Sequence, residues 1–244
     1  MARILTFLYG IIAYAVFFIT FLYAIGFVGN IIVPKSIDSG VQGVFTKSIL
    51  INVILLGLFA VQHSVMARPA FKRWWTKIIP EPIERSTYVL LSSLLLALLF
   101  WLWQPMIGSI WNVNNIFGST ILTGLFWLGW IIVLLSTFMI NHFDLFGLRQ
   151  VYLYMQRKEY TSVEFRSPAL YRYMRHPIMT GFIIAFWATP QMTTGHLLFA
   201  IATTAYILIG VQLEEQDLLK FYGESYNQYR RQVSMLIPII RKKR

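Results

Sequence analysis

Residues 177–213 read PIMTGFIIAFWATPQMTTGHLLFAIATTAYILIGVQL and contain no Asp, Glu, Lys or Arg. A single α-helix of this length would measure roughly 55 Å, nearly twice the ~30 Å hydrocarbon core of a membrane. Pro190 cannot continue a helix, and Gly195 allows the chain to turn. The stretch therefore predicts a membrane hairpin of two helices, the first of which is short.

The rest of the chain carries further stretches of the same kind. The whole chain is 57% hydrophobic and only 13% charged, which is outside the range of ordinary soluble domains. Four more stretches are apolar enough to cross a membrane: Ile4–Val33, Ser48–Met66, Thr87–Gln104 and Ser119–Ile140. The predicted fold class is an all-α, polytopic transmembrane helix bundle with five to six membrane segments. The last two segments form the hairpin, and a cytosolic amphipathic C-terminal helix follows.

The basic residues predict the orientation of this bundle. With the N-terminus in the cytoplasm, all but two of the 21 Lys and Arg residues lie on the cytoplasmic side, and the exceptions are Lys35 and Lys47. No linker or repeat separates parts of the chain, so we expect a single integral membrane domain over residues 1–244. The N-terminus, the C-terminus and any site between them are expected in the cytoplasm.

Charge and composition exclude several classes of partner. The net charge of +11 is explained by this topology and by attraction to anionic membrane lipid, at about 1 kcal/mol for each basic residue near the surface. No recognition motif accompanies the basic loops, so nucleic acid is not an expected partner. The chain has no cysteine, and its four histidines show no His-x-x-x-His spacing, so no metal site is expected.

Polar residues gather at the predicted cytoplasmic ends of different helices. They are Gln62, His63, Asn141, His142, Asp144, Arg175, His176, Glu214 and Glu215. Any one of them has an ordinary explanation, because polar side chains often lie at the membrane interface. Two adjacent carboxylates gain little from an anionic surface, so Glu214 and Glu215 predict a cationic partner, either Arg175 or a ligand.

Two motifs carry a family resemblance. Residues 175–181, RHPIMTG, and residues 214–229, EEQDLLKFYGESYNQY, flank the predicted hairpin. Together they resemble the paired signature of the isoprenylcysteine carboxyl methyltransferase and phospholipid methyltransferase superfamily, over residues 165–240. Many members have a tyrosine two residues after the proline, where this chain has Met179.

Two further stretches are similar to one family within that superfamily. Residues 141–150, NHFDLFGLRQ, and residues 185–196, AFWATPQMTTGH, are similar to the membrane-bound bacterial methanethiol S-methyltransferases, which make dimethyl sulfide. This resemblance implies transfer of a methyl group from S-adenosylmethionine to a small thiol. It also implies a bacterial inner-membrane location and no metal.

The resemblance implies that S-adenosylmethionine lies between the hairpin and the C-terminal segment. Arg175 and His176 are expected to hold its carboxylate, helped by the N-terminus of the helix that Pro177 opens. Glu214 and Glu215 suit the ribose hydroxyls or the ammonium group, or one of them pairs with Arg175. The other positions assigned to cofactor binding are Pro177, Met179, Gly181, Tyr222, Tyr226 and Tyr229.

The tyrosines belong to a periodic pattern that has two interpretations. Leu218, Tyr222, Tyr226, Tyr229 and Val233 recur at helical intervals and predict one face of an amphipathic helix. This face either packs the tail onto the bundle or covers the cofactor, with a tyrosine against the adenine.

A small alkanethiol is mostly protonated at neutral pH, so a base is expected to assist the reaction. The first candidates are His142 and Asp144, with Asn141 beside them and His63 and His176 behind them. Asp144 is expected to orient His142 or to act on its own, unless residues 141–144 only cap a helix.

Two functions of other classes remain open from the sequence. One is methylation of a lipid-like acceptor, such as a prenylcysteine carboxylate or a phospholipid amine, which requires a lateral opening for an acyl or prenyl chain. The other is a non-enzymatic membrane protein that uses the bundle for assembly. A nicotinamide-dependent reductase is a more remote option, because no glycine-rich fingerprint supports it.

Overall fold

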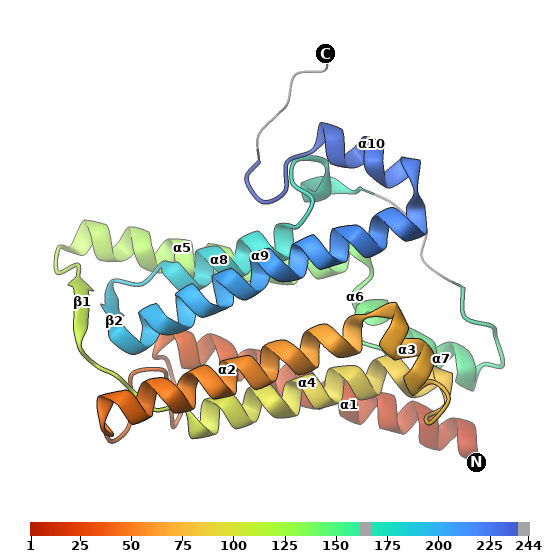
Figure 1. Ribbon diagram of the computed structural model, residues 1–244, viewed down its shortest axis with the longest axis horizontal. Coiled ribbons are helices and arrows are strands. Elements are labelled where there is room, and N and C mark those ends of the chain that lie inside the picture. The colour runs from red at the N-terminus through yellow and green to blue at the C-terminus, as the bar shows by residue number, and fades with distance from the viewer. Residues whose placement is uncertain (162–166, 239–244) are drawn as a thin grey trace. The chain divides into compact units, whose positions relative to one another are not determined.

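A computed structural model describes residues 1–161 and 167–238 and is mostly helical (Figure 1). Within these residues, five helices are long and apolar enough to cross a membrane: α1 (Ala2–Gly29), α2 (Phe45–Ala67), α4 (Glu81–Leu102), α5 (Ile116–Ile140) and α9 (Thr194–Tyr222). The predicted class of a multi-pass helical membrane protein is confirmed. Each long helix coincides with one of the apolar stretches in the sequence.

The remaining elements are short. The helices are α3 (Pro69–Trp75), α6 (His142–Leu145), α7 (Leu148–Met155), the 3₁₀ helix η1 (Ala169–Arg172), α8 (Pro177–Trp187) and α10 (Glu224–Gln232). Strands β1 (Ser109–Asn112) and β2 (Gln191–Thr193) form a two-stranded sheet. This small sheet departs from the all-α prediction. Its two short strands lie about 80 residues apart in the sequence, so neither segment alone indicates the pairing.

The predicted hairpin is present, with its break where the sequence places it. Helix α8 has 11 residues and is about 16 Å long, so it cannot cross a ~30 Å core. Pro190 follows it, and the Pro190 carbonyl accepts a hydrogen bond of 2.9 Å from the Val113 amide. Helix α9 then runs for 29 residues. It continues beyond Leu213, where the apolar stretch ends, because Glu, Gln, Leu and Lys are all good helix formers.

The described chain forms two compact units. Unit 1 contains residues 1–108, 141–161 and 193–196, and unit 2 contains residues 109–140, 167–192 and 197–238. The single domain expected over residues 1–244 stays a prediction. Its signature range of 165–240 extends at both ends to positions, 165–166 and 239–240, that lie outside the described residues.

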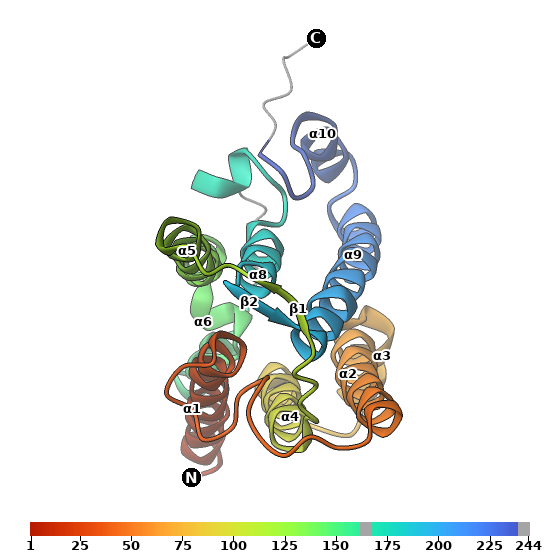
Figure 2. The same ribbon diagram turned by 90° about the vertical axis from the view of Figure 1, so that its left-hand side faces the viewer.

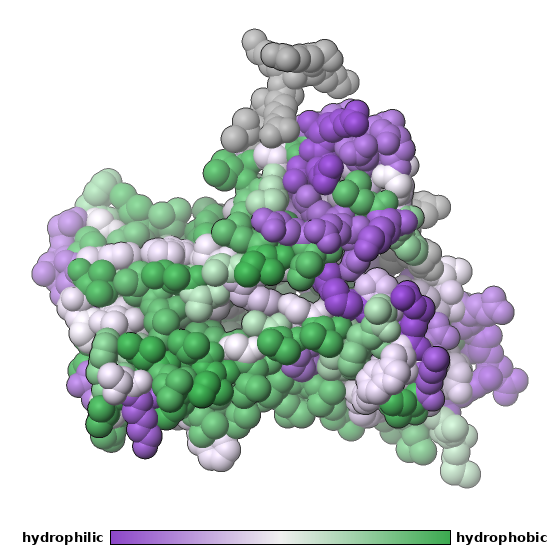
Figure 3. All heavy atoms as spheres, in the orientation of Figure 1, coloured by the Kyte–Doolittle hydropathy of each residue, from purple (hydrophilic) through white to green (hydrophobic). Residues whose placement is uncertain are grey.

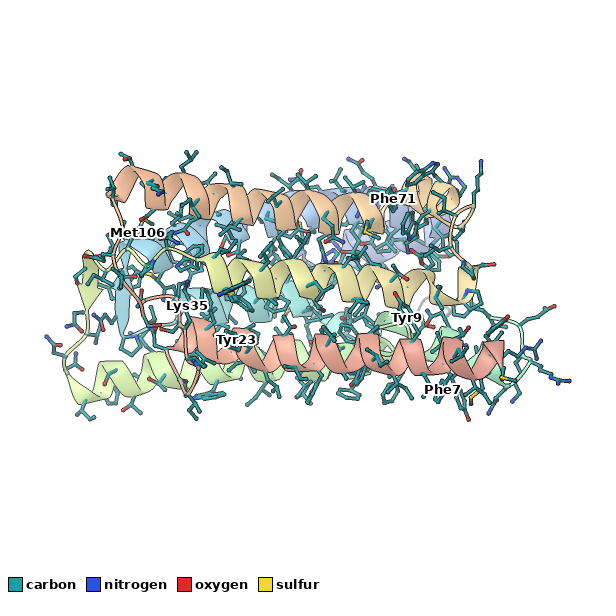
Figure 4. The ribbon with its side chains drawn as sticks, turned by 90° about the horizontal axis from the view of Figure 1, so that it is seen from below. Phe7, Tyr9, Tyr23, Lys35, Phe71 and Met106 are labelled. Atoms are coloured by element: carbon teal, nitrogen blue, oxygen red, sulfur yellow. The ribbon has the colours of Figure 1, made fainter. Side chains whose placement is uncertain are left out.

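Unit 1 is built around α4, which lies between α1 and α2 when the three helices are seen end on (Figure 2). The Tyr9 hydroxyl of α1 lies 2.9 Å from the Thr87 hydroxyl of α4, and Figure 4 shows Tyr9 in this position. Gly10 lets α1 approach α7, because an added Cβ would collide with the Val151 side chain. This packing places the start of α1 beside residues 141–155.

Unit 2 contains a tight contact between α5 and α8. A Cβ added to Gly129 would lie 2.6 Å from the Ala185 amide nitrogen and 2.7 Å from the Gly181 carbonyl oxygen. A Cβ added to Gly181 would lie 2.7 Å from the Gly129 carbonyl oxygen. Small residues at such a crossing let two backbones touch within a membrane. Gly181 lies in this helix contact, and its assignment to cofactor binding, implied by the family resemblance, stays a prediction.

We expect Gly129→Ala to destabilise the protein by about 1–3 kcal/mol, because its new methyl group meets backbone atoms that cannot move aside easily. Gly124→Ala on the same helix is the matched control, since a Cβ there meets nothing within 4 Å. Thermal unfolding of the two purified variants in one detergent measures the difference. Equal unfolding temperatures would show that α5 and α8 do not pack through Gly129.

Candidate active site

The start of α8 is fixed by the C-terminal segment of unit 2. Pro177 occupies the first turn of α8, and the residues before it pair with residues 234 and 235. The Arg175 amide donates to the Ser234 carbonyl at 2.9 Å, and the His176 amide donates to the Met235 carbonyl at 3.1 Å. The backbone N–H groups of Arg175 and His176, just before α8, are therefore already hydrogen-bonded within the protein.

Arg175, His176 and Glu215 form a buried cluster, which we call the Arg175 cluster. The Arg175 Nε donates to Glu215 Oε1 at 2.7 Å, and the His176 Nε2 lies 3.1 Å from the same oxygen. The side chains of the three residues are only 9%, 7% and 10% exposed. Arg175 Nη1 also donates to the carbonyls of Arg230 and Val233. One guanidinium thus joins the residues before α8 to α9, to α10 and to Val233 directly after α10.

The two adjacent glutamates have different environments. Glu215 pairs with Arg175. The sequence had left open which of the two glutamates would do so. Glu214 is 46% exposed, and its Oε2 lies 3.7 Å from His176 Nδ1. His176 therefore faces two carboxylates, which favour a positive charge nearby and disfavour an added anion. Glu214 is the carboxylate of this pair that a ligand can reach.

Three tyrosines lie beside the cluster. The Tyr229 hydroxyl donates to the Tyr171 carbonyl, and the ring centroids of Tyr226 and Tyr229 lie 5.9 Å apart. Burial raises the pKa of Tyr229 to about 12, and burial raises the pKa of Tyr171 and of Tyr226 as well. All three phenols are therefore neutral at physiological pH, and they act as aromatic surfaces and hydrogen-bonding groups.

The single amphipathic helix predicted from Leu218 to Val233 is wrong. Helix α9 ends at Tyr222, and Gly223 adopts a φ of +57°, a value that favours glycine. Helix α10 begins after it. The stripe is thereby divided, with Tyr222 half buried at the end of α9 and Tyr226 buried on α10.

The candidate bases lie in unit 1, after the end of α5. Asn141 caps α6, since its side-chain oxygen accepts a 3.2 Å hydrogen bond from the Asp144 amide. His142 is 5% exposed, and its Nε2 lies 2.8 Å from the Tyr14 hydroxyl. Burial lowers the pKa of His142 below its ordinary value of 6.5. His142 is thus neutral at neutral pH and able to accept a proton.

Asp144 has partners of its own. Arg149 Nη1 lies 2.9 Å from Asp144 Oδ1, and the Tyr160 hydroxyl donates to Asp144 Oδ2 at 3.3 Å. The Tyr14 hydroxyl supplies a contact that orients His142. The Asp144 carboxylate is thus engaged by Arg149 and Tyr160, which makes His142 the better candidate.

His63, the remaining histidine of the predicted layer in unit 1, has a separate set of partners. Its Nε2 lies 2.9 Å from the Tyr88 hydroxyl, and its Nδ1 lies 3.2 Å from the Ser92 hydroxyl. Tyr88 belongs to a hydrophobic cluster that includes Phe146, whose ring lies 4.8 Å from that of His142. His63 and His142 therefore border one aromatic cluster within unit 1.

Sequence reasoning missed several residues of these sites. Tyr14 contacts His142 from 128 positions away, and no sequence signal distinguishes it, because α1 also carries hydroxyls at Tyr9, Thr20 and Tyr23. Thr180 donates to the Leu236 carbonyl at 2.8 Å and adds to the pairing of α8 with the C-terminal segment. Met179 is half buried on α8, and its assignment to cofactor binding stays a prediction.

Comparison with known proteins agrees with the family resemblance. The family model described as "NnrU protein" matches residues 50–217. A methanethiol S-methyltransferase from Crocosphaera subtropica is 58% identical over 243 residues, which are 100% of this chain and 95% of that protein. No solved structure matches the chain significantly.

Further relatives carry the same name. The methanethiol S-methyltransferase of Mycobacterium tuberculosis is 57% identical over 98% of both chains. Methanethiol S-methyltransferase 2 of Bradyrhizobium diazoefficiens is 56% identical over 97% of this chain and 91% of its own. Sequence identity at this level along the full length shows homology, and the chain belongs to the methanethiol S-methyltransferase family.

Proposed function

We propose that this protein methylates methanethiol to dimethyl sulfide, with S-adenosylmethionine as the methyl donor. The observation that carries the proposal is the 58% identity over the whole chain to a protein named for this reaction. The five long apolar helices agree with a membrane enzyme whose substrate is small and apolar.

The Arg175 cluster is proposed as the region that binds the methyl donor. The roles proposed for its residues differ from those expected from the sequence. Arg175 is engaged by Glu215 and by two carbonyls, so the anion clamp expected from the sequence has little support. The exposed carboxylate of Glu214 suits an ammonium group or ribose hydroxyls, and the half-buried neutral ring of Tyr229, backed by the buried Tyr226, suits a flat base. These residues fit S-adenosylmethionine through its cationic and aromatic parts.

His142 is proposed as the base that takes the thiol proton. Its support is a neutral imidazole at neutral pH, held by the Tyr14 hydroxyl at 2.8 Å. The S–H bond of methanethiol breaks, the proton goes to an imidazole nitrogen of His142, and the sulfur electron pair forms the new bond to carbon. When bound, S-adenosylmethionine supplies a methyl group on a sulfonium and departs as the neutral thioether.

The orientation with the N-terminus in the cytoplasm is part of the same proposal. It is supported by the position of the Lys and Arg residues, all but two of which fall on one side. The donor would then be taken from the cytoplasm, and the bacterial inner membrane would hold the protein.

Headspace gas chromatography over the purified protein tests the function. Methanethiol and S-adenosylmethionine are supplied to the intact protein, with vials that lack protein or donor as controls. Dimethyl sulfide is expected only in the complete mixture. A preparation that binds S-adenosylmethionine by calorimetry but makes no dimethyl sulfide would contradict the thiol as acceptor and favour a lipid-like one.

A further inference from the structure

An apolar groove runs along the outer face of α2, within unit 1. Its wall is a stripe of α2 residues at helical spacing, completed by one residue each from α3 and α4. The groove has a volume of about 550 Å³, and the lining residues used here are Ile54, Gly57, Leu58, Val61, Phe71 and Leu95. Figure 3 shows this face of α2 as mostly hydrophobic, and Figure 4 labels Phe71 at its α3 end.

Gly57 widens this groove about one helical turn from its Ile54 end. A Cβ added there would meet nothing within 4 Å, so the absent side chain leaves free space. From Ile54 to Val65 the stripe is roughly 17 Å long, which is close to half of the ~30 Å hydrocarbon core. The groove therefore has the length of an acyl chain in one leaflet.

The one amide in the wall makes its hydrogen bonds inside the protein. Gln62 Nε2 donates to Met66 Sδ at 3.0 Å, and Gln62 Oε1 accepts from the Ser92 hydroxyl at 3.2 Å. The amide does not require a polar ligand as a partner. An occupant of the groove is consequently held by hydrocarbon contacts.

Positive charge lies at the α3 end of the groove. Arg68 continues the α2 stripe three residues after Val65, and Lys72 lies one turn further on. Burial and the charge of Arg85 lower the pKa of Lys72, with a smaller contribution from Arg68, while the carboxylates of Glu84 and Asp144 act in the opposite direction. A phosphate placed at this end would gain a favourable interaction with Arg68 and Lys72. Trp74, which is 52% exposed, adds an aromatic side chain typical of the membrane interface.

We propose that this groove binds one anionic phospholipid, with an acyl chain along α2 over Gly57 and the phosphate at Arg68 and Lys72. The apolar wall selects the chain, and the cations select the charge of the headgroup. The site shares no residue with the Arg175 cluster and does not include His142, and its occupancy is measured without reference to turnover.

The chain-binding half of the proposal is tested with Gly57→Leu. Native mass spectrometry of the full-length protein, titrated with dioleoylphosphatidylglycerol, counts bound lipid. Leucine fills the groove, and excluding even two methylenes of the acyl chain weakens binding about tenfold. Gly124→Leu on α5 is the matched control, because Gly124 also has nothing within 4 Å of an added Cβ. Equal lipid binding by the two variants, both with wild-type thermal unfolding, would overturn the proposal.

The headgroup half is tested with Lys72→Gln against Lys47→Gln, which removes an exposed charge at the opposite end of α2. Lys72→Gln is expected to weaken phosphatidylglycerol binding about fivefold, and Lys47→Gln is expected to leave it unchanged. Dioleoylphosphatidylcholine should bind more weakly than phosphatidylglycerol, and glycerol 3-phosphate should not compete. Equal affinity for both lipids, or displacement by glycerol 3-phosphate alone, would overturn the assignment to an anionic phospholipid.

Discussion

Arg175→Ala is expected to abolish methyl transfer and to lower the free energy of unfolding by about 3–5 kcal/mol. The substitution leaves the buried Glu215 carboxylate without its arginine and frees the carbonyls of Arg230 and Val233. The end of α10 and Val233 would then lose their side-chain hydrogen bonds to the residues before α8, while the backbone pairing of residues 234 and 235 would remain. Thermal unfolding in detergent and the rate of dimethyl sulfide formation measure the two effects.

Arg172→Ala is the control for this prediction, because Arg172 is an exposed arginine three residues earlier in the chain. It should change neither stability nor turnover appreciably, since exposed charges contribute little. Glu215→Gln should resemble Arg175→Ala, since it removes the same ion pair from the other side. Wild-type stability and turnover in both Arg175→Ala and Glu215→Gln would refute the role of the Arg175 cluster.

His142→Gln is expected to slow turnover by roughly a hundred- to ten-thousand-fold while leaving S-adenosylmethionine binding unchanged, because it removes the proposed base. Glutamine keeps a side-chain amide beside Tyr14 but cannot take up a proton at neutral pH. Single-turnover rates and calorimetric titration of the donor separate the two quantities. If only Asp144→Asn slows turnover and His142→Gln does not, the base is Asp144.

The pH dependence of turnover gives an independent check on His142. The neutral imidazole is the active form, so turnover falls as the pH drops through the pKa of His142. Burial lowers that pKa, so the fall should lie below the ordinary value of 6.5 and should be absent in His142→Gln. A wild-type profile that instead falls well above 6.5 would point to a different ionising group.

Much of the fold could be predicted from the sequence, because a membrane span needs only a long apolar stretch without charge. The hairpin was predictable for the same reason, with Pro190 at its break. The end of α9 was harder to predict. Glu214 and Glu215 mark the end of the apolar stretch and suggested a boundary, but glutamate is a good helix former and the helix continues to Tyr222. Gly223 was the available signal for the break, because glycine readily adopts the positive φ found there.

The site was predictable in part. The pairing of Arg175 with a glutamate follows from a buried charge that needs a partner, but the sequence could not choose between Glu214 and Glu215. That choice depends on which carboxylate α9 turns toward α8. The contact between Tyr14 and His142 was not predictable, since it depends on how α1 packs beside α6.

The most direct test of the proposed function follows the methyl group itself. The purified protein is given methanethiol and S-adenosylmethionine that carries a deuterated methyl group, and the headspace is analysed by mass spectrometry. We predict dimethyl sulfide with one deuterated methyl, formed in equal amount to S-adenosylhomocysteine and absent with Arg175→Ala. Unlabelled dimethyl sulfide, or none from a preparation that binds the donor, would contradict methyl transfer to methanethiol.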